Sequence, residues 1–359
     1  MRIAGNKERF LLINGLIGIG LMVALSMLFK SSGNSAFAEL RIAAENMKQS
    51  LKVIEDYCIQ HQINTDNPED PRHTGLIGPE WSELTTTVGD PEAKRTTINP
   101  NFAALIAHLL KETGVKKGDT IAIGSSASFP ALLIASLSAA KALELNPVVI
   151  ISFGSSSFGA SNPDFTFWDL YHLLLDRHMI DFKPVAASIG GEDDTGLEFD
   201  RNISDRFRRS LEEAGIPLIT EKDLQINRSI REKFYFAGNP HRIKAFINSG
   251  GGFANLGSSQ AVLNIKPGLV RKVQIPEPEK QGMIHTMLLK KIPVIHLLFI
   301  KGLAQKYNLP WDPASQPQIT QHSIQFNGRQ DPAILIFSLI GLLWFILVLM
   351  WYRMLYNSH

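Results

Sequence analysis

The strongest pattern along the chain is a pair of long apolar segments, one toward each end. Residues 10–29 and residues 333–352 contain no charged side chain. Each segment has about 20 residues, the length that an α-helix needs to cross the hydrocarbon core of a bilayer. We therefore expect transmembrane helices at 10–30 and 333–352, with one large domain between them.

Charged residues beside these segments predict the orientation of the chain. Arg2, Lys7 and Arg9 precede the first segment, and Arg353 follows the second. Positively charged flanks stay on the cytoplasmic side of a membrane. Both ends of the chain, 1–9 and 353–359, are therefore expected in the cytoplasm, and the domain is expected outside it.

The first apolar segment also has an alternative interpretation as a signal peptide. Residues 36–38 read Ala-Phe-Ala, which is a cleavage-site pattern. The apolar core of a signal peptide usually has about 7–15 residues, and this segment is longer, so an uncleaved anchor is favoured. Both alternatives place the domain outside the cytoplasm.

Between the two segments, short apolar runs alternate with longer helical patterns. Strands are expected at 120–123, 147–153, 184–189, 217–220 and 243–249, and helices at 100–113, 130–145, 167–179, 204–214 and 223–234. Such alternation is typical of βαβ units and a parallel sheet. The expected fold class is α/β, with a mainly parallel sheet and helices on both faces, flanked by the two transmembrane helices.

Less regular segments border this α/β domain, which we place at 100–309. Residues 31–99 are expected to form a helix at 38–60 and then a long irregular loop at 64–99, rich in Pro, Gly, Asp and Thr. Residues 310–332 are expected to form a linker back to the membrane.

Composition excludes several classes of function. Cys58 is the only cysteine, so the chain has no internal disulfide and no cysteine-rich metal site. The 36 basic and 34 acidic residues are nearly balanced, so no basic field suggests a nucleic-acid partner. The chain has neither a Walker A motif nor a GxGxxG motif, and we expect no cofactor.

Four glycine- and serine-rich loops follow predicted strands. Their candidate ligand-binding residues are Gly124, Ser125, Ser126, Ser128, Gly154, Ser155, Ser156, Gly190, Gly191, Gly250, Gly251, Gly252 and Asn255. Because parallel strands end at one edge of a sheet, these loops are expected to converge there. Glycine lets backbone N–H groups approach a ligand closely, and serine hydroxyls add donors, which suits a carboxylate or a phosphate.

A serine nucleophile is the main catalytic alternative. Residues 124–128 (GSSAS) lack only the last glycine of the nucleophile elbow G-x-S-x-G, with Ser126 at the nucleophile position. His285, His296 or His241 could supply the base, and Asp193 or Asp194 could orient it. Ser126 as a hydrogen-bond donor is the simpler interpretation. The acidic loop around Asp193 is more typical of a solvated loop than of a cation site, so no metal is expected.

Several of these stretches resemble a bacterial family, the poly-γ-glutamate system proteins. The resemblance rests on residues 121–130 (IAIGSSASFP), 148–152 (VVIIS) with 154–159 (GSSSFG), 293–297 (PVIHL) and 309–313 (LPWDP), and it extends over nearly the whole chain. It implies a pathway rather than catalytic residues.

The implied role is in making or exporting poly-γ-glutamate, an anionic capsule-like polymer, at the bacterial inner membrane. Expected partners are the lipid bilayer, the membrane subunits of the synthase, and the polymer or another carboxylate-bearing ligand. Three hypotheses follow: a membrane-anchored accessory protein that binds polymer or synthase, a serine-dependent hydrolase or acyl-transfer enzyme that acts on the polymer, and a scaffold whose cleft is vestigial.

Overall fold

The structure, a computed structural model, describes residues 37–63, 66–324, 326 and 339–346, and the single residues 14, 18, 348, 350 and 353. The chain forms two units, which we describe separately: Glu39–Ile324, and Met1–Ala38 together with Gln325–His359. Within the described residues, no helix combines the length and the apolar character needed to cross a bilayer. Most of the predicted spans, 10–30 and 333–352, lies outside the described residues.

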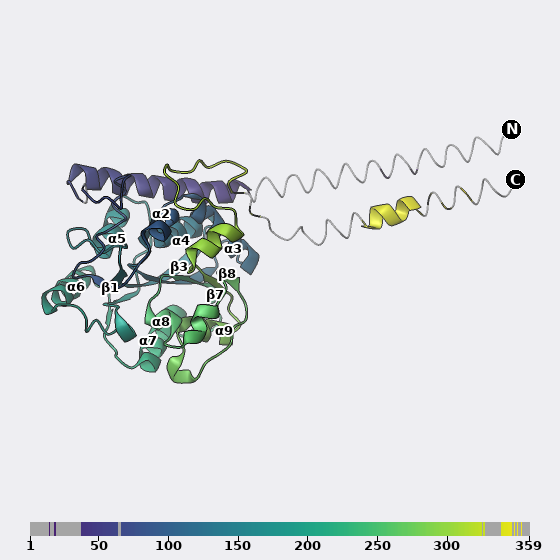
Figure 1. The fold of residues 1–359 in the computed structure, drawn as a ribbon. Helices are drawn as coiled ribbons and strands as arrows, with labels where there is room; N and C mark the ends of the chain where they lie inside the picture. The colour runs from purple at the N-terminus through teal and green to yellow at the C-terminus, as the bar shows by residue number, and fades with distance from the viewer. Residues whose placement is uncertain are drawn as a thin grey trace, which may run out of the picture. The chain divides into compact units, whose positions relative to one another are not determined.

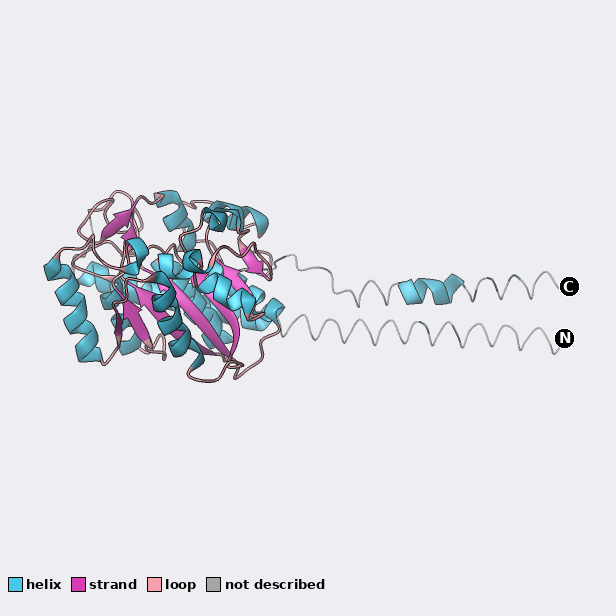
Figure 2. Ribbon diagram, turned by 90° about the horizontal axis from the view of Figure 1, so that it is seen from below, coloured by secondary structure: helices cyan, strands magenta, loops and turns pink. Residues whose placement is uncertain are grey.

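A seven-stranded twisted sheet forms the centre of the larger unit (Figure 2). Its strands are β2 (Thr120–Ser126), β3 (Asn146–Ser152), β5 (Ala186–Ser188), β6 (Leu218–Ile219), β7 (Ile243–Ser249), β8 (Gly268–Val270) and β9 (Val294–His296). The spatial order is β6-β5-β3-β2-β7-β9-β8, and only β8 runs antiparallel. The prediction of an α/β fold with a mainly parallel sheet is confirmed.

Helices cover both faces of this sheet (Figure 1). They are α2 (Pro91–Thr97), α3 (Asn101–Thr113), α4 (Pro130–Ala142), α5 (Phe167–Asp176), α6 (Arg201–Ala214), α7 (Leu224–Phe236), α8 (Phe253–Leu256), α9 (Met283–Leu289) and α10 (Ile300–Lys306), with 3₁₀ turns at Glu192–Asp194, Gln260–Asn264 and Pro278–Lys280. In Figure 1, α2, α3 and α4 lie above the sheet, and α7, α8 and α9 lie below it. The central strands β2 and β3 are buried along almost their whole length because helices shield them on both sides.

The segment before α3 is more ordered than its composition suggests. Residues 37–60 form one helix, and its predicted apolar positions are buried: Leu40, Ala43, Ala44, Met47, Leu51 and Ile54. The prediction of an irregular loop throughout 64–99 is wrong, because β1 (Thr85–Thr87) pairs there with β4 (Ser155–Ser156) in a small separate sheet, and α2 follows. Asp90 caps α2, and Pro91 occupies its first turn.

The expected linker also packs onto the domain. Arg95 of α2 donates to both carboxylate oxygens of Asp312, at 2.8 and 2.7 Å, and Trp311 donates to Glu92 at 2.7 Å. These contacts tie residues 310–312 to α2, and the compact unit extends on to Ile324. The compact unit therefore includes more of the chain than the α/β domain predicted at 100–309.

A buried ion pair joins α7 to the carboxyl ends of two strands. Arg231 donates to the Asp194 carboxylate at 2.6 Å and to the Ser188 hydroxyl at 2.7 Å. Asn227, one turn earlier on α7, donates to Asp194 at 3.0 Å and accepts from Arg231 at 2.9 Å. Since Ser188 ends β5 and also bonds to Ser152 at the end of β3, the network fixes α7, both strand ends and the loop that carries Asp194.

Replacement of Arg231 by methionine should destabilise the protein strongly. The change leaves the buried Asp194 carboxylate without its cation, which typically costs about 3–5 kcal/mol. Thermal unfolding of the detergent-solubilised chain would measure the effect. The double variant Arg231→Met/Asp194→Asn should recover part of the loss because the orphaned charge is then absent. Equal destabilisation in the single and double variants would contradict this account.

Candidate functional site

The four predicted loops line one cavity of about 500 Å³ at the carboxyl edge of the sheet. The candidate residues that border it are Ser126, Ser128, Gly154, Ser156, Gly190, Gly191, Gly251 and Gly252. The remaining candidates, Gly124, Ser125, Ser155, Gly250 and Asn255, are not among its lining residues. Thr86, Thr87, Val88, Phe129, Ser152, Glu192, Glu198, Phe253 and Leu298 complete the wall.

The cavity lies at the position where the strand order reverses. From β2 the chain adds β3, β5 and β6 on one side, and it then returns to place β7 on the other side of β2. Ligands of open α/β sheets bind at such a switch point, in the crevice outside the strand ends. Here the crevice lies between Ser126, the last residue of β2, and Gly251 and Gly252, which follow β7.

Ser126 carries an unsatisfied hydroxyl at this point. The residue is only 4% exposed, and its Oγ has no hydrogen-bond partner within the described part of the chain. Buried polar groups are nearly always paired, so an unpaired one calls for an explanation. A ligand acceptor or donor in the cavity would satisfy this hydroxyl.

Two glycines allow the close packing around Ser126. A Cβ on Gly124 would overlap with the Asn255 amide, and a Cβ on Gly250 would overlap with Ser126 Oγ. Gly250 also has φ +110°, a left-handed conformation that favours glycine. These two glycines thus allow Asn255 and Ser126 to pack closely at the end of β2, next to the cavity.

Two candidate serines, Ser125 and Ser155, donate hydrogen bonds to other protein atoms and do not line the cavity. Ser125 Oγ donates to Ser249 Oγ at 3.4 Å, and Ser155 Oγ donates to the Ser156 carbonyl at 2.8 Å. Because β2 extends to Ser126 instead of ending at 123, Ser125 lies within the strand. Its side chain and that of Ser126 therefore point to opposite faces of the sheet.

The structure does not assemble the triad that the order Ser-Asp-His suggests. No histidine contacts Ser126 Oγ, since that atom has no partner among the described residues. His285 accepts from the Gly282 amide at 3.0 Å, and His296 lies 3.2 Å from the Asn248 amide nitrogen. Burial lowers the pKa of His296 to about 4, so this ring is neutral at physiological pH.

The aspartates of the acidic loop do not orient a histidine either. Asp194 is buried and bound by Arg231 and Asn227. The side chain of Asp193 lies outside the described atoms. No group of three or more potential metal-ligating His, Cys, Asp or Glu side chains occurs within the described residues.

Sequence reasoning missed the most unusual charged residue near the cavity, Lys94. It belongs to α2, in the stretch predicted as a loop, and it is 2% exposed. Its Nζ donates to the Ser128 carbonyl and, at 2.6 Å, to Ser156 Oγ, and it lies 3.7 Å from the centre of the Phe129 ring. Asp90 and Pro91 form a helix-start signal that would have identified α2, but no local pattern indicates that Lys94 points inward.

The cavity wall combines groups of opposite electrostatic character. Glu192 and Glu198 contribute carboxylates, and the Glu192 amide donates to the Glu198 carboxylate. The wall also contains the Ser126 hydroxyl and Phe129, the N-cap of α4, which makes no side-chain capping bond. A helix N-terminus carries partial positive charge, so acidic side chains and groups that favour an anion line the same cavity.

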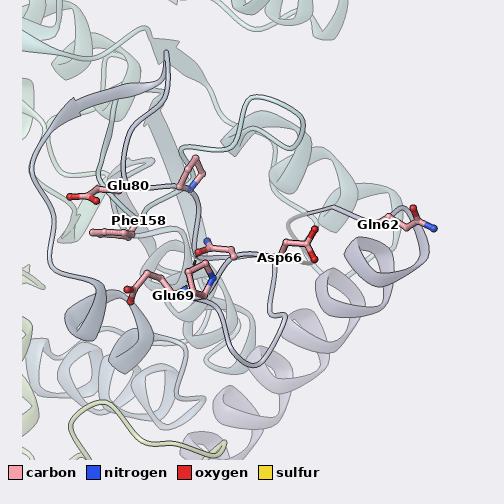
Figure 3. A pocket seen from close by; sticks show the side chains of 8 residues that line it. Gln62, Asp66, Glu69, Glu80 and Phe158 are labelled. Carbon is pink, nitrogen blue, oxygen red and sulfur yellow. Dashed lines mark hydrogen bonds between the residues drawn. The ribbon is translucent and has the colours of Figure 1, made fainter.

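A second pocket has a different character. It is lined by Gln62, Asp66, Asn67, Pro68, Glu69, Pro79, Glu80 and Phe158. Figure 3 shows Glu69 and Glu80 on either side of Phe158, with Asp66 and Gln62 farther along the rim. Glu69 already accepts from Arg95 at 2.5 Å. Acidic side chains make this pocket unsuited to an anionic ligand.

Comparison with known proteins does not identify a relative. No family model, curated protein or solved structure matches this chain. Its function must therefore be inferred from the geometry of the cavity and from the residues themselves.

The burial of Lys94 predicts a pH-dependent stability. Burial lowers the pKa of the Lys94 ammonium to about 7, against the opposing effect of the nearby Asp90 charge. An unfolded lysine has a pKa of about 10.4. Between these two values the unfolded chain binds more protons, so stability rises with pH from about 7 to about 10 and is lost as the pH falls through that window.

A comparison of wild type with Lys94→Met should show this effect. The difference in free energy of unfolding should change across the window by at most about 1.4 kcal/mol per pH unit and stay constant below it. Thermal unfolding at a series of pH values would measure it. Parallel curves for the two proteins would show that Lys94 titrates normally.

Proposed function

We propose that this chain is a membrane-anchored accessory protein of poly-γ-glutamate synthesis or export, and that its α/β domain binds a carboxylate-bearing chain in the switch-point cavity. The motif resemblance supports the pathway, and the two charge-free terminal segments support the anchoring. In the smaller unit, a Cβ on Gly18 would lie 2.7 Å from the Trp344 ring, so Gly18 lies directly against Trp344. Close packing on small residues is typical of paired membrane helices.

The unpaired Ser126 hydroxyl is the observation that carries the binding proposal. It borders the cavity, and the four candidate loops surround it. Gly251 and Gly252 line the same cavity, and no hydrogen bond within the described residues uses their backbone N–H groups. Together these groups provide donors for a carboxylate without a buried counter-charge.

The two glutamates in the cavity wall narrow the choice of ligand. Glu192 and Glu198 would repel a second carboxylate and attract an ammonium group. A chain end that carries both a free amine and a carboxylate matches both kinds of group in the cavity wall. We therefore favour the amino-terminal residue of the polymer over an internal segment, and a volume of about 500 Å³ suits a ligand of this size.

Gly251→Val should test this site without disturbing the fold. A Cβ on Gly251 meets no atom within 4 Å, so the valine should be accommodated and should occupy ligand space. We expect binding of a γ-linked glutamate oligomer to weaken at least about tenfold, equivalent to ~1.4 kcal/mol. The unfolding midpoint should not change. Calorimetric titration of the detergent-solubilised chain would measure binding.

Two further variants complete this experiment. Ser126→Ala removes a hydroxyl without a protein partner, so it should preserve stability and weaken binding by about 1.5–3 kcal/mol if the partner is charged. Ser258→Val is the matched control, because Ser258 is exposed and does not line the cavity. Unchanged binding in stably folded Gly251→Val would rule out a ligand role for that loop.

The proposed topology can be tested with the single cysteine. Cys58 is buried, and burial raises the pKa of its thiol to about 12, so it should react slowly. In the variant Ser258→Cys, an exposed thiol should react with a membrane-impermeant maleimide added to intact spheroplasts, whereas wild type should not. Reaction only after lysis would place the domain in the cytoplasm.

A further inference from the structure

The contact between Lys94 and Ser156 brings a buried amine to a serine that borders the cavity. Ser156 lies in β4, is 6% exposed, and accepts from Lys94 Nζ at 2.6 Å. The Ser156 amide in turn donates to Ser128 Oγ at 3.0 Å. This backbone bond and the pairing of β4 with β1 hold Ser156 in place at the cavity wall.

The surroundings of Lys94 favour the uncharged amine. Within the described residues, no carboxylate lies within ion-pair distance of Nζ, and its partners are one carbonyl, one hydroxyl and the face of Phe129. A buried cation without an anion is costly, and the usual outcome is loss of the proton. The pKa of about 7 leaves a large fraction of the amine neutral at physiological pH and able to accept a proton.

A purely structural role would be a clamp between α2 and the loop after β2. The bond from Lys94 to the Ser128 carbonyl is enough for such a clamp. The second contact, to a hydroxyl at the cavity wall, goes beyond what a clamp requires. A serine beside a neutral lysine is an established nucleophile–base pair that uses no histidine.

We propose that Ser156 is a nucleophile and Lys94 its general base, and that the pair catalyses acyl transfer from an amide or ester carbonyl bound in the cavity. The choice of the γ-linked amide of poly-γ-glutamate as substrate rests on the proposed function. The reactivity of Ser156 does not depend on the proposed function. This activity differs from the serine-enzyme hypothesis based on Ser126, whose Oγ has no hydrogen-bond partner among the described residues.

The reaction balances with water as the second substrate. Neutral Lys94 Nζ takes the proton of Ser156 Oγ as the oxygen bonds to the carbonyl carbon. Collapse of the tetrahedral intermediate breaks the C–N bond, and the leaving amine takes the proton from the Lys94 ammonium, which leaves an ester on Ser156. Water then attacks this ester, Lys94 accepts a proton from it, and Ser156 Oγ regains that proton as the acid departs.

The start of α4 lies in the same wall and favours the negative charge of the intermediate. The helix has 13 residues, and its N-cap Phe129 lines the cavity and lies against Lys94. No hydrogen bond among the described residues uses the backbone N–H of Ser128 or Phe129. Donors and dipoles aimed at a developing oxyanion are a major source of rate acceleration.

Covalent labelling of the detergent-solubilised full chain with phenylmethanesulfonyl fluoride tests the pair directly. Mass spectrometry should locate one adduct on Ser156, and Ser156→Ala should abolish it. Lys94→Met should slow labelling by about 100-fold or more, since general-base catalysis typically contributes about 10²–10⁴. Ser258→Ala, which changes an exposed serine outside the cavity, should label like wild type.

If a variant fails to fold, the pH dependence of labelling in the wild-type protein still tests the proposal. Labelling should rise with pH to a plateau, with a midpoint near pH 7, as Lys94 loses its proton. An adduct on another serine, no adduct, or a rate that keeps rising toward pH 10 would overturn the proposal.

Incubation with γ-linked glutamate oligomers separates this inference from the proposed function. Shortened oligomers in wild type but not in Ser156→Ala would support both. Labelling of Ser156 with intact oligomers would keep the nucleophile and reject the polymer amide as substrate. Oligomer binding without labelling would keep the binding function and reject the nucleophile.

Discussion

The ion pair between Arg231 and Asp194 is the interaction on which the geometry of the cavity depends. It ties α7, below the sheet, to the ends of β3 and β5 through Ser152 and Ser188. The same carboxylate anchors the loop that carries Gly190 and Gly191 into the cavity wall. Breaking such a pair is strongly unfavourable once it is buried, so this loop has little freedom. A glycine-rich loop, otherwise suited to motion, is thereby made a fixed wall.

Strand ends form the remaining walls, which explains why small residues dominate there. At the switch point β2 and β7 diverge into loops, and Ser126 faces the glycines after β7. The lining also includes residues of β1, β4 and the N-cap of α4. A cavity between backbone segments of this kind offers N–H groups and hydroxyls rather than charged side chains, so its selectivity depends on the few charges at its rim, Glu192 and Glu198.

Sequence patterns predicted the alternating strands and helices of the parallel sheet well. The strand expected at 243–249 is β7, and the helix expected at 167–179 is α5, which begins with a capping box between Thr166 and Asp169. Both were predictable because apolar period and capping chemistry are local properties. The antiparallel edge strand β8 and the two-residue strand β4 were not predicted, because such short segments cannot show a hydrophobic period. The convergence of the four loops followed from topology. The role of Lys94 did not, because its burial depends on contacts with Ser128 and Ser156, which are distant in sequence.

Two basic side chains, Arg231 and Lys94, are thus buried near one cavity, and their surroundings differ. Arg231 has a carboxylate, an amide and a hydroxyl as partners, and its forked guanidinium contacts all of them. Among the described residues, Lys94 has no carboxylate within ion-pair distance, and an amine responds to such burial by a lowered pKa. Exchanging the two residue types would remove both properties: a lysine could not match the forked contacts of Arg231, and an arginine could not release a proton to act as a base. The fixed charge therefore holds the cavity in shape, and the titratable amine is the group through which that cavity can do chemistry.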